Sequence, residues 1–517
     1  MLSIAAILES KAREYPEKSA IIFQDNKFTF FQINAMANQV ANGLKESGIQ
    51  KGDRVAFTCP NLPYFPIVYF GIIKAGAIVV PLNILLKARE VEYHLNDSKA
   101  KAYFCFEGTE ELPMGSQGHT AFETVPSCEH FWMITANPAG SSPIEGTSTL
   151  AALIHGKSPE FTSVPTLADD TAIILYTSGT TGQAKGAELT QSNVMMNTIL
   201  TKQLFEGGPD DIHLVVLPLF HTFGQTVQML GGLLGGNTLV LVPRFDAEVV
   251  LQTLEKENIT VFCGVPTMYW GLVNHADPEN KINLKKIAST LRLCASGGAS
   301  IPVEIIKQFE EKFNVPILEG YGLSETSPVA TFSRIDIEKK PGSVGVPIWG
   351  VEVQIFDQDD KPLPAEEVGE IVVRGHNVMK GYLDRPEATQ EAMRNGWFHT
   401  GDLGKKDQEG YVYIVDRVKD MILRGGFNVY PREIEEVLIT HPAISMAAVI
   451  GVPHESHGEE VKAFVILKEG DEATEEEIIQ WSKEQMASYK YPRFVEMRES
   501  LPMNATGKIL KRELKSQ

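Results

Sequence analysis

The segment AIILYTSGTTGQAKG, residues 172–186, joins an apolar run to a loop of glycine and hydroxyl residues. The apolar residues 172–175 have the length and composition of a buried strand. A helix is expected from Thr190 onward, so the loop would lie at the carboxyl end of a sheet strand. That edge is where α/β folds bind their ligands, and the segment therefore bears on both the fold and the site.

The loop has the composition of an anion-binding site. Gly179 and Gly182 let the backbone approach a ligand closely, so that N–H groups can point at an anion. Lys185 adds a positive charge, although the spacing of glycine and lysine differs from that of the Walker phosphate loop. The sequence predicts a phosphate cradle, with a flexible surface loop as the alternative. The residues expected to hold phosphate are Thr177, Ser178, Gly179, Thr180, Thr181, Gly182 and Lys185.

The composition is that of a large, acidic globular protein. The 517 residues carry 47 Lys and Arg against 66 Asp and Glu, a formal net charge of −19. This excess of negative charge argues against binding to nucleic acid and leaves at most peripheral contact with a membrane surface. The five cysteines are scattered without a CxxC pair, which indicates buried thiols in a reducing compartment. The N-terminus lacks a signal-peptide pattern, and the cytoplasm is the expected location.

Short apolar runs alternate with helix-like stretches along most of the chain. Runs at 237–242, 259–266 and 315–322 predict buried parallel strands joined by crossover helices. Residues 107–165 are rich in Gly, Ser, Pro and Thr and are expected to be loops. After about residue 340, short strands separated by Gly, Asp and Pro turns predict a small β-barrel. The predicted fold class is therefore α/β, with two layered parallel-type sheets and a small β-barrel in a large N-terminal domain.

The last hundred or so residues form a separate unit in this prediction. A helix is expected from Pro431, because proline suits the first turn of a helix, and a strand, a strand and a helix follow. These elements predict a small α+β domain at the C-terminus. The expected boundaries are residues 1–416 for the N-terminal domain, 417–420 for a hinge and 421–517 for the C-terminal domain.

Five further motifs accompany the loop in a fixed order. They are SGGAS (296–300), EGYGLSET (319–326), WFHTGDLG (397–404), VDRVKD (415–420) and NATGKILK (504–511). With the loop, they make the chain resemble the acyl-adenylate-forming superfamily, which includes acyl-CoA synthetases, adenylation domains of peptide synthetases and firefly luciferase. The resemblance covers nearly the whole chain, and it implies that the C-terminal domain is mobile. GVPTMY, ILEGYGLSE and the Tyr430–Pro431 pair look most like bacterial fatty-acyl-CoA synthetases.

The resemblance implies a two-step reaction that uses ATP, Mg²⁺ and coenzyme A. A carboxylate attacks the α-phosphate of ATP to give an acyl-adenylate and pyrophosphate, and the thiol of coenzyme A then displaces AMP. Three alternatives stay open: an aryl or other acid as substrate, a carrier protein as thiol acceptor, and a binder without catalysis. Members of the superfamily are monomers or dimers, so a homodimer is also compatible with the resemblance.

The resemblance also implies roles for single residues. The loop would hold the β- and γ-phosphates, and Thr177 and Glu325 would hold Mg²⁺. Asp402 would accept both ribose hydroxyls, Arg417 would support the ribose, and Lys508 would bridge the attacking carboxylate and the α-phosphate. The implied catalytic set is Lys508, Glu325, Thr177 and Lys185. The other implied nucleotide-site residues are Gly298, Glu319, Gly320 and Tyr321 around the adenine, Ser324 at the α-phosphate and Lys419 at the hinge.

The acyl pocket implied by the resemblance is mostly apolar. Its segments hold no Asp for an ammonium group and no Arg for a second carboxylate, which favours a fatty or aryl acid. The chain departs from the usual family pattern at Ala184, where a proline is common, and at Leu423, where many relatives have a lysine. His454 and His457 lack the HExxH spacing of a zinc site and are interpreted as a surface loop. The expected substrate residues are His221, Phe223, Val265, Gly297 and Gly322.

Overall fold

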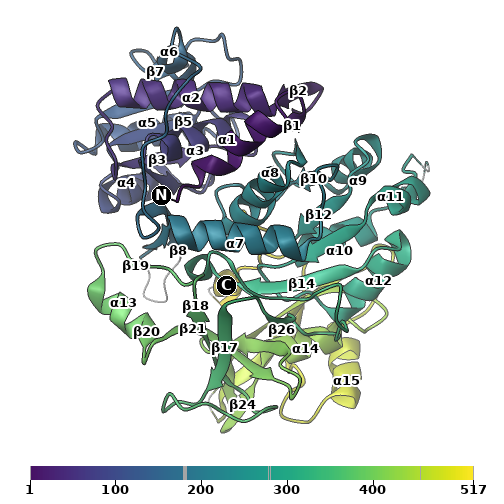
Figure 1. Ribbon diagram of the computed structural model, residues 1–517. Coiled ribbons are helices and arrows are strands. Elements are labelled where there is room, and N and C mark those ends of the chain that lie inside the picture. The colour runs from purple at the N-terminus through teal and green to yellow at the C-terminus, as the bar shows by residue number, and fades with distance from the viewer. Residues whose placement is uncertain (1, 178–182, 278, 280, 455, 516–517) are drawn as a thin grey trace.

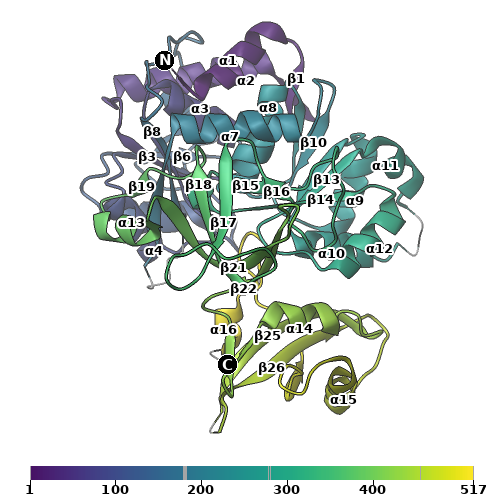
Figure 2. The same ribbon diagram turned by 60° about the horizontal axis from the view of Figure 1, so that its bottom comes forward.

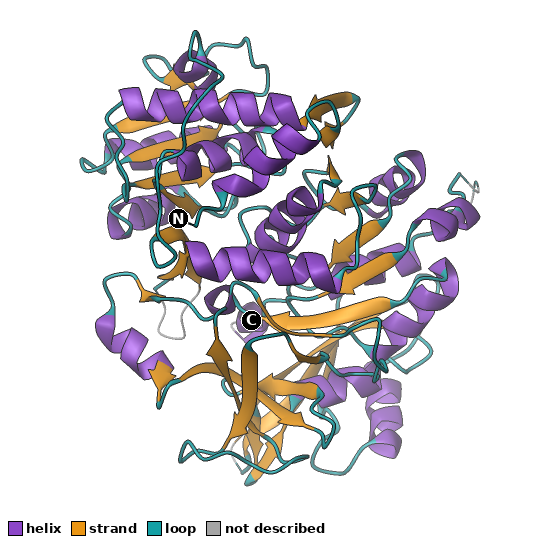
Figure 3. Ribbon diagram, viewed as in Figure 1, coloured by secondary structure: helices purple, strands orange, loops and turns teal. Residues whose placement is uncertain are grey.

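The computed structural model describes residues 2–177, 183–277, 279, 281–454 and 456–515 of the chain. Two large sheets covered by helices form the body of the N-terminal domain, and a small antiparallel sheet adjoins them (Figure 1). The C-terminal unit lies below this body, next to the small sheet (Figure 2). Helices and strands alternate along most of the chain (Figure 3), so the α/β fold class predicted from the sequence is confirmed.

The strand before the glycine-rich loop belongs to an eight-stranded sheet with the order β19-β9-β8-β4-β3-β5-β6-β7. From β8 to β7 the neighbouring strands run parallel, and β8 then pairs with β9 in antiparallel fashion across the loop. The loop therefore joins two strands, and the expected helix begins only after the second of them. The strands are β3 (Arg54–Thr58), β4 (Ile78–Pro81), β5 (Ala102–Phe106), β6 (His130–Ile134), β7 (Ser148–Thr149), β8 (Thr171–Thr177), β9 (Lys185–Thr190) and β19 (Gly381–Tyr382).

The second large sheet has nine strands in the order β16-β15-β14-β13-β12-β10-β11-β1-β2. Its central strands are parallel, and antiparallel strands are added at both edges. The apolar runs at 237–242, 259–266 and 315–322 each supply one of the parallel strands, as predicted. The strands are β1 (Ser19–Phe23), β2 (Asn26–Thr29), β10 (Ile212–Val215), β11 (Thr238–Leu241), β12 (Val261–Gly264), β13 (Leu293–Ser296), β14 (Ile317–Gly322), β15 (Val329–Phe332) and β16 (Val346–Pro347).

The helices follow local sequence signals. Thr29 caps the N-terminus of α2 in a capping box with Gln32, and Thr190 caps α7 in the same way with Asn193. In Figure 1, α7 crosses the middle of the N-terminal domain. The helices of this domain are α1 (Ala5–Glu14), α2 (Phe30–Glu46), α3 (Tyr64–Lys74), α4 (Ala88–Asp97), α5 (Met114–Glu123), α6 (Leu150–Ile154), α7 (Gln191–Leu204), the π-helix η1 (Phe223–Leu230), α8 (Gly231–Gly235), α9 (Ala247–Lys256), α10 (Pro266–Asn274), α11 (Leu284–Thr290), α12 (Val303–Phe313), the 3₁₀ helix η2 (Ser324–Thr326) and α13 (Pro386–Ala392).

The prediction of loops over residues 107–165 is wrong in part, because α5, β6, β7 and α6 lie in this range. Two of the glycines that suggested loops, Gly115 and Gly118, instead lie in α5 and allow close packing. A Cβ atom on Gly118 would lie 2.7 Å from Cys105 Sγ, so only glycine lets α5 approach β5 so closely. Tertiary packing here outweighs the weak local preference of the sequence for a helix.

The small antiparallel sheet has the order β17-β18-β21-β20, with β22 paired to β21. The sequence predicted this unit as a small β-barrel. In the structure its five strands pair as an open sheet. Its strands are short and separated by turns, as the Gly, Asp and Pro residues indicated. The strands are β17 (Val351–Phe356), β18 (Gly369–Gly375), β20 (Met393–Arg394), β21 (Trp397–Lys406) and β22 (Val412–Arg417).

The C-terminal unit has a core and a sheet of its own. Its hydrophobic cluster contains Ile422, Ile434, Val449 and Val465, and its sheet has the order β24-β23-β26-β25 with β27 paired to β26. The helix expected from Pro431 begins at that residue. Among the described residues, no helix combines the length and apolar character needed to span a membrane. The elements are β23 (Ile422–Arg424), β24 (Phe427–Val429), α14 (Pro431–Leu438), β25 (Ile444–His454), β26 (Gly458–Leu467), α15 (Glu475–Gln485), β27 (Phe494–Met497) and α16 (Lys511–Lys515).

Candidate active site

A cavity of about 1410 Å³ lies where the sheets of the N-terminal domain meet the end of the chain. Its walls include the ends of β8, β13 and β14, the strands β21 and β22, and the turn that carries Lys508. Ligand pockets typically occupy roughly 300–1,000 Å³, so this cavity is large enough for more than one reactant. The glycine-rich loop and the five further motifs all contribute described residues to its lining, whereas the Tyr430–Pro431 and His454–His457 pairs do not.

Thr177 and Glu325 meet on one wall of the cavity. The Thr177 hydroxyl donates a hydrogen bond of 3.1 Å to Glu325 Oε1, and the Tyr382 hydroxyl donates one of 3.0 Å to the same oxygen. Lys185 is the register partner of Thr177 across β8 and β9, and its Nζ atom lies 5.3 Å from the centre of the Tyr382 ring. These contacts bring the two described ends of the glycine-rich loop next to Glu325. Ser178, Gly179, Thr180, Thr181 and Gly182 lie outside the described residues.

Asp402 lies on another wall, only 5 % exposed and held by two neighbours. The Tyr321 hydroxyl donates a 2.8 Å hydrogen bond to Oδ2, and Arg417 Nε lies 3.0 Å from Oδ1. Asp402 and Arg417 are register partners on β21 and β22, so the sheet itself sets this ion pair. Burial and the Asp402 carboxylate raise the pKa of Tyr321, which keeps its hydroxyl protonated as the donor.

Lys508 enters the same cavity from the C-terminal unit. It lies in a turn in which Asn504 Oδ1 accepts a 2.9 Å hydrogen bond from the Lys508 backbone N–H. The Thr267 hydroxyl on α10 donates a 2.9 Å hydrogen bond to the carbonyl of Gly507, which ties the turn to the N-terminal domain. Enclosure in the cavity, and next the Arg417 guanidinium, lowers the pKa of Lys508 to about 8. Lys508, Asp402 and Arg417 therefore share one site.

The expected substrate residues also line the cavity, on its more apolar side. Phe223 begins the π-helix η1, a geometry that is rare and frequent at functional sites. A Cβ atom on Gly297 would lie 3.1 Å from the Phe223 ring, so a side chain there would crowd the pocket. Enclosure lowers the pKa of His221 to about 4, and its imidazole is therefore neutral at pH 7. The lining includes His221, Phe223, Val265, Gly297 and Gly322, as expected.

The structure brings most of the expected nucleotide-site residues together, with one exception. Gly298, Gly320, Tyr321, Ser324 and Lys419 all line the cavity. Glu319 does not line it and is buried in the interior, where burial raises its pKa to about 7. Arg432 and Lys339, whose charges act on the Glu319 carboxyl group, do not line the cavity either.

Several residues that sequence reasoning missed support the glycine-rich loop. The Tyr93 hydroxyl donates a 2.7 Å hydrogen bond to the Ala184 carbonyl at one end of the loop. The Tyr176 hydroxyl donates a 2.8 Å hydrogen bond to Asp97 Oδ2 at the other end. Both partners come from α4, and no local pattern in that helix indicates such a role. Only the packing of α4 beside β8 and β9 shows it.

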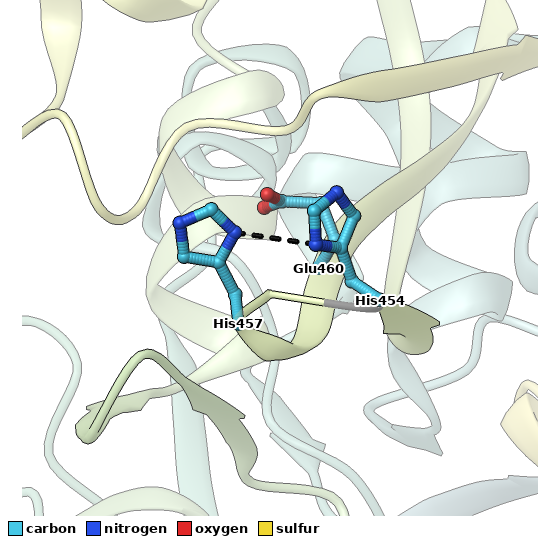
Figure 4. A group of neighbouring side chains, drawn as sticks. All are labelled: His454, His457 and Glu460. Atoms are coloured by element: carbon cyan, nitrogen blue, oxygen red, sulfur yellow. Dashed lines mark hydrogen bonds between the residues drawn. The ribbon is translucent and has the colours of Figure 1, made fainter.

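His454, His457 and Glu460 form the group of side chains drawn in Figure 4. The two imidazole Nδ1 atoms are 3.2 Å apart, at the turn between β25 and β26. The Glu460 carboxylate is held by Arg424, whose Nε and Nη2 lie 2.5 and 2.8 Å from its oxygens. A carboxylate committed to an arginine is a poor metal ligand. The interpretation of the histidines as a surface turn agrees with these contacts.

Comparison with known proteins identifies the family. The chain matches the model of the AMP-binding enzyme over residues 8–383 and that of the AMP-binding enzyme C-terminal domain over residues 433–508. A long-chain-fatty-acid–CoA ligase from Bacillus subtilis (strain 168) is 36 % identical over 531 residues, which cover 99 % of this chain and 94 % of that protein. A feruloyl-CoA synthase from Amycolatopsis sp is 36 % identical over 506 residues, which cover 98 % and 97 %.

A solved structure supports the same relationship over the whole chain. ATP-bound MatB from Rhodopseudomonas palustris has a TM-score of 0.89 at 32 % identity, covering 100 % of this chain and 99 % of that chain. The apo form of MatB, with the same identity and coverage, has a TM-score of 0.79. The cavity combines described residues from the glycine-rich loop with Asp402, Arg417 and the C-terminal Lys508, and both family models match in order. The chain therefore belongs to the AMP-binding enzyme family.

Proposed function

We propose that this protein is an acid–thiol ligase that activates a carboxylic acid with ATP and transfers the acyl group to coenzyme A. The observation that carries the proposal is the meeting of Lys508, Asp402 and the Thr177–Glu325 pair in one cavity. Lys508 comes from the C-terminal unit, Asp402 from the small sheet, and the Thr177–Glu325 pair from the two large sheets. No local sequence signal brings these units together. The names of the relatives, a fatty-acid–CoA ligase and a feruloyl-CoA synthase, support the same reaction.

The residues in the cavity suit ATP as a substrate. The Asp402 carboxylate has oxygen acceptors for the ribose hydroxyls, and Arg417 holds that carboxylate in place. Lys185 and the loop ends would face the β- and γ-phosphates, with Gly298, Gly320 and Tyr321 beside the adenine and Ser324 towards the α-phosphate. Lys419 lies at the hinge side of the cavity. Thr177 and Glu325 present neighbouring hard oxygen donors, which fit Mg²⁺. Bound there, Mg²⁺ would offset the negative charge of the phosphates.

In the first step, a carboxylate oxygen of the acid bonds to the α-phosphorus of ATP, and the bond from this phosphorus to the bridging oxygen breaks. Pyrophosphate leaves with the electron pair. The Lys508 ammonium group lines the cavity, where it would contact both the attacking carboxylate and the α-phosphate and offset the charge that builds up on them. Lys185 does the same for the leaving pyrophosphate. Positioning and electrostatic stabilisation are the main tasks of the protein.

In the second step, the thiolate sulfur of coenzyme A bonds to the acyl carbon, and AMP leaves with the carboxyl oxygen that joined it to the acyl group. While Lys508 lies in the cavity, it blocks access of coenzyme A to the acyl carbon. The C-terminal unit must therefore move between the steps. We place the hinge at residues 417–420, between β22 of the small sheet and β23 of the C-terminal sheet. The two MatB structures support such motion, because one protein gives TM-scores of 0.89 and 0.79 with this chain in its ATP-bound and apo forms.

The proposed acid is apolar. His221 is neutral, and Phe223, Val265, Gly297 and Gly322 give the acyl side of the cavity a mostly apolar surface. A fatty or aryl acid suits these walls better than an amino acid or a dicarboxylic acid. A carrier-protein thiol is the second candidate acceptor, because the resemblance leaves the acceptor of the second step open.

The test is pyrophosphate release from ATP and Mg²⁺ with acids from acetate to palmitate, and with benzoate and coumarate, each with and without coenzyme A. We expect turnover with apolar acids and an acyl-CoA product when coenzyme A is present. Turnover that requires a holo-carrier protein would favour the second acceptor. Binding of ATP without turnover of any acid would contradict the proposed function.

A further inference from the structure

We infer that Phe205, with Thr201 and Val227, forms the end wall of the acyl pocket and limits the substrate to acids of medium length. This inference rests on the proposed function and adds the size class of the acid. The three side chains line the large cavity, and they also line a second cavity of about 10 Å³ behind it. Because these three residues line both cavities, they form the partition between them.

The partition is apolar on the side of the acyl pocket. Phe205 is 4 % exposed and follows the last residue of α7, and its ring centre lies 5.8 Å from that of Phe332. The Thr201 hydroxyl donates a 2.8 Å hydrogen bond to the Asn197 carbonyl, so this polar group is satisfied within α7. Val227 comes from η1, which packs against α7. The end of an apolar chain would therefore meet carbon atoms at this wall.

Behind the partition the surroundings are polar. The second cavity is lined by Lys202, His213, Asn237 and Arg292. Among the described residues, His213 Nδ1 is a buried atom with no hydrogen-bond partner. Arg292 is bound to Asp211, with Nε 2.7 Å from Oδ1 and Nη2 2.6 Å from Oδ2, and its Nη1 donates to the Phe205 carbonyl at 2.9 Å. An apolar chain that passed Phe205 would have to displace or desolvate these groups, so the wall is also an energetic limit.

The sheet register gives the depth of the pocket. His213 on β10 is level with Val261 on β12, which is level with Leu293 on β13. Ser296 is three residues further along β13, and we take this end of the strand, next to Gly297, as the mouth of the acyl pocket. At about 3.3 Å per residue of a parallel strand, the mouth lies about 10 Å from the level of His213. The Phe205 and His213 rings are stacked with centres 6.4 Å apart, so we place the wall near that level.

This depth sets the length of the acid. Successive carbon atoms about 1.5 Å apart advance an extended zigzag chain by about 1.3 Å each, so about 10 Å holds about eight carbons. We therefore expect octanoate and decanoate, or an aryl acid of the same length such as coumarate, to fill the pocket. Palmitate is too long to lie in it.

The experiment measures kcat/KM for pyrophosphate release with fatty acids of four to sixteen carbons, each below the concentration at which it forms micelles. For the unaltered protein we expect a rise of about fourfold per added methylene, the factor that corresponds to about 0.8 kcal/mol of apolar burial. The rise should end near eight to ten carbons and be followed by a fall of at least tenfold by sixteen. Palmitate turned over as well as octanoate would overturn the inference, while any turnover at all keeps the proposed function.

Variants of the wall give the second part of the test. Phe205→Ala removes the ring, and we expect the best chain length to increase by two to four carbons. Phe205→Leu retains most of the volume and the fold, and should shift the optimum by about one to two carbons. Phe313→Leu is the matched control, because Phe313 is buried in the same core but does not line the cavity. An unchanged length profile in folded Phe205 variants would contradict the role of this residue as the wall.

Discussion

Thr267 Oγ1 donates a hydrogen bond of 2.9 Å to the Gly507 carbonyl, although 240 positions separate the two residues. Thr267 belongs to α10 of the N-terminal domain, and Gly507 immediately precedes Lys508. A Cβ atom on Gly507 would lie 2.8 Å from Thr267 Oγ1, and φ of Gly507 is +80°, so both the contact and the backbone require glycine. This bond ties the turn that carries Lys508 to the N-terminal domain, in the arrangement that we propose for the first step.

Replacing the Thr267 hydroxyl should slow acid activation selectively. A hydrogen bond contributes about 0.5–1.5 kcal/mol net, so Thr267→Val is expected to reduce kcat/KM for pyrophosphate release by about three- to tenfold. Thioester formation from supplied acyl-adenylate should change less, because that step needs Lys508 out of the cavity. Thr253→Val is the control, since Thr253 bonds only within α9 among the contacts observed. Equal losses in both half-reactions would contradict a role for this contact in the first step.

Removing the Lys508 charge should have the largest effect on the first step. Loss of a group that stabilises charge in the transition state typically costs about 10²–10³ in rate, and we expect this for Lys508→Ala in pyrophosphate release. Conversion of supplied acyl-adenylate to acyl-CoA should persist. Lys468→Ala, in the same C-terminal unit but outside the cavity lining, serves as the control. Full first-step activity in Lys508→Ala would remove this lysine from the mechanism.

The pKa of Lys508 predicts an alkaline limit to the first step. Enclosure and the Arg417 guanidinium lower this pKa from 10.5 to about 8, so the ammonium form is present below pH 8 and is lost above it. The kcat/KM for pyrophosphate–ATP exchange reports on the free enzyme and should fall up to tenfold per pH unit above about 8. Lys508→Arg keeps its charge to pH 12 and should show a lower but flat profile in this range. A wild-type profile that stays level to pH 10 would contradict the assignment.

Tyr93 should affect the affinity for ATP. Its hydroxyl holds the Ala184 carbonyl at 2.7 Å, at the position where relatives commonly have a stiffening proline. Tyr93→Phe removes one hydrogen bond from the loop, and we expect KM for ATP to rise about three- to tenfold with a smaller change in kcat. Tyr411→Phe is a matched control, because Tyr411 makes a bond of the same kind and length to the Glu338 carbonyl outside the cavity. Equal effects of the two substitutions would indicate a general loss of stability.

Local signals in the sequence were sufficient for many elements of the fold. Thr29 and Gln32, or Thr190 and Asn193, satisfy the first free N–H groups of a helix with their own side chains, so the start of the helix is readable. Pro431 indicates a helix start in the same way. Residues 107–165 were misread because the glycines of α5 serve close packing against β5, and nothing in the local sequence distinguishes such glycines from those of a loop.

The site residues likewise divide into those that the motifs indicated and those that only the structure revealed. The motifs indicated Thr177, Glu325, Asp402, Arg417 and Lys508 one by one, and the structure brings these five into one cavity. Glu319 was assigned to the same cavity from its motif, yet it lies buried outside the cavity lining. Tyr382 and Tyr93 had no motif at all. They matter because packing places them against Glu325 and Ala184.

The sequence by itself determined the strand before the glycine-rich loop, the capped helices, the separate C-terminal unit and the kinds of side chain that ATP chemistry needs. These depend on periodicity, backbone preference and motif order, which act over a few residues. Only the tertiary structure decided that Lys508 lies beside Asp402 and Arg417, that Tyr93 bonds to the end of the loop, and that Phe205 lies between the large cavity and the small one. Contacts between distant residues depend on how whole layers pack, and no short stretch of sequence contains that information.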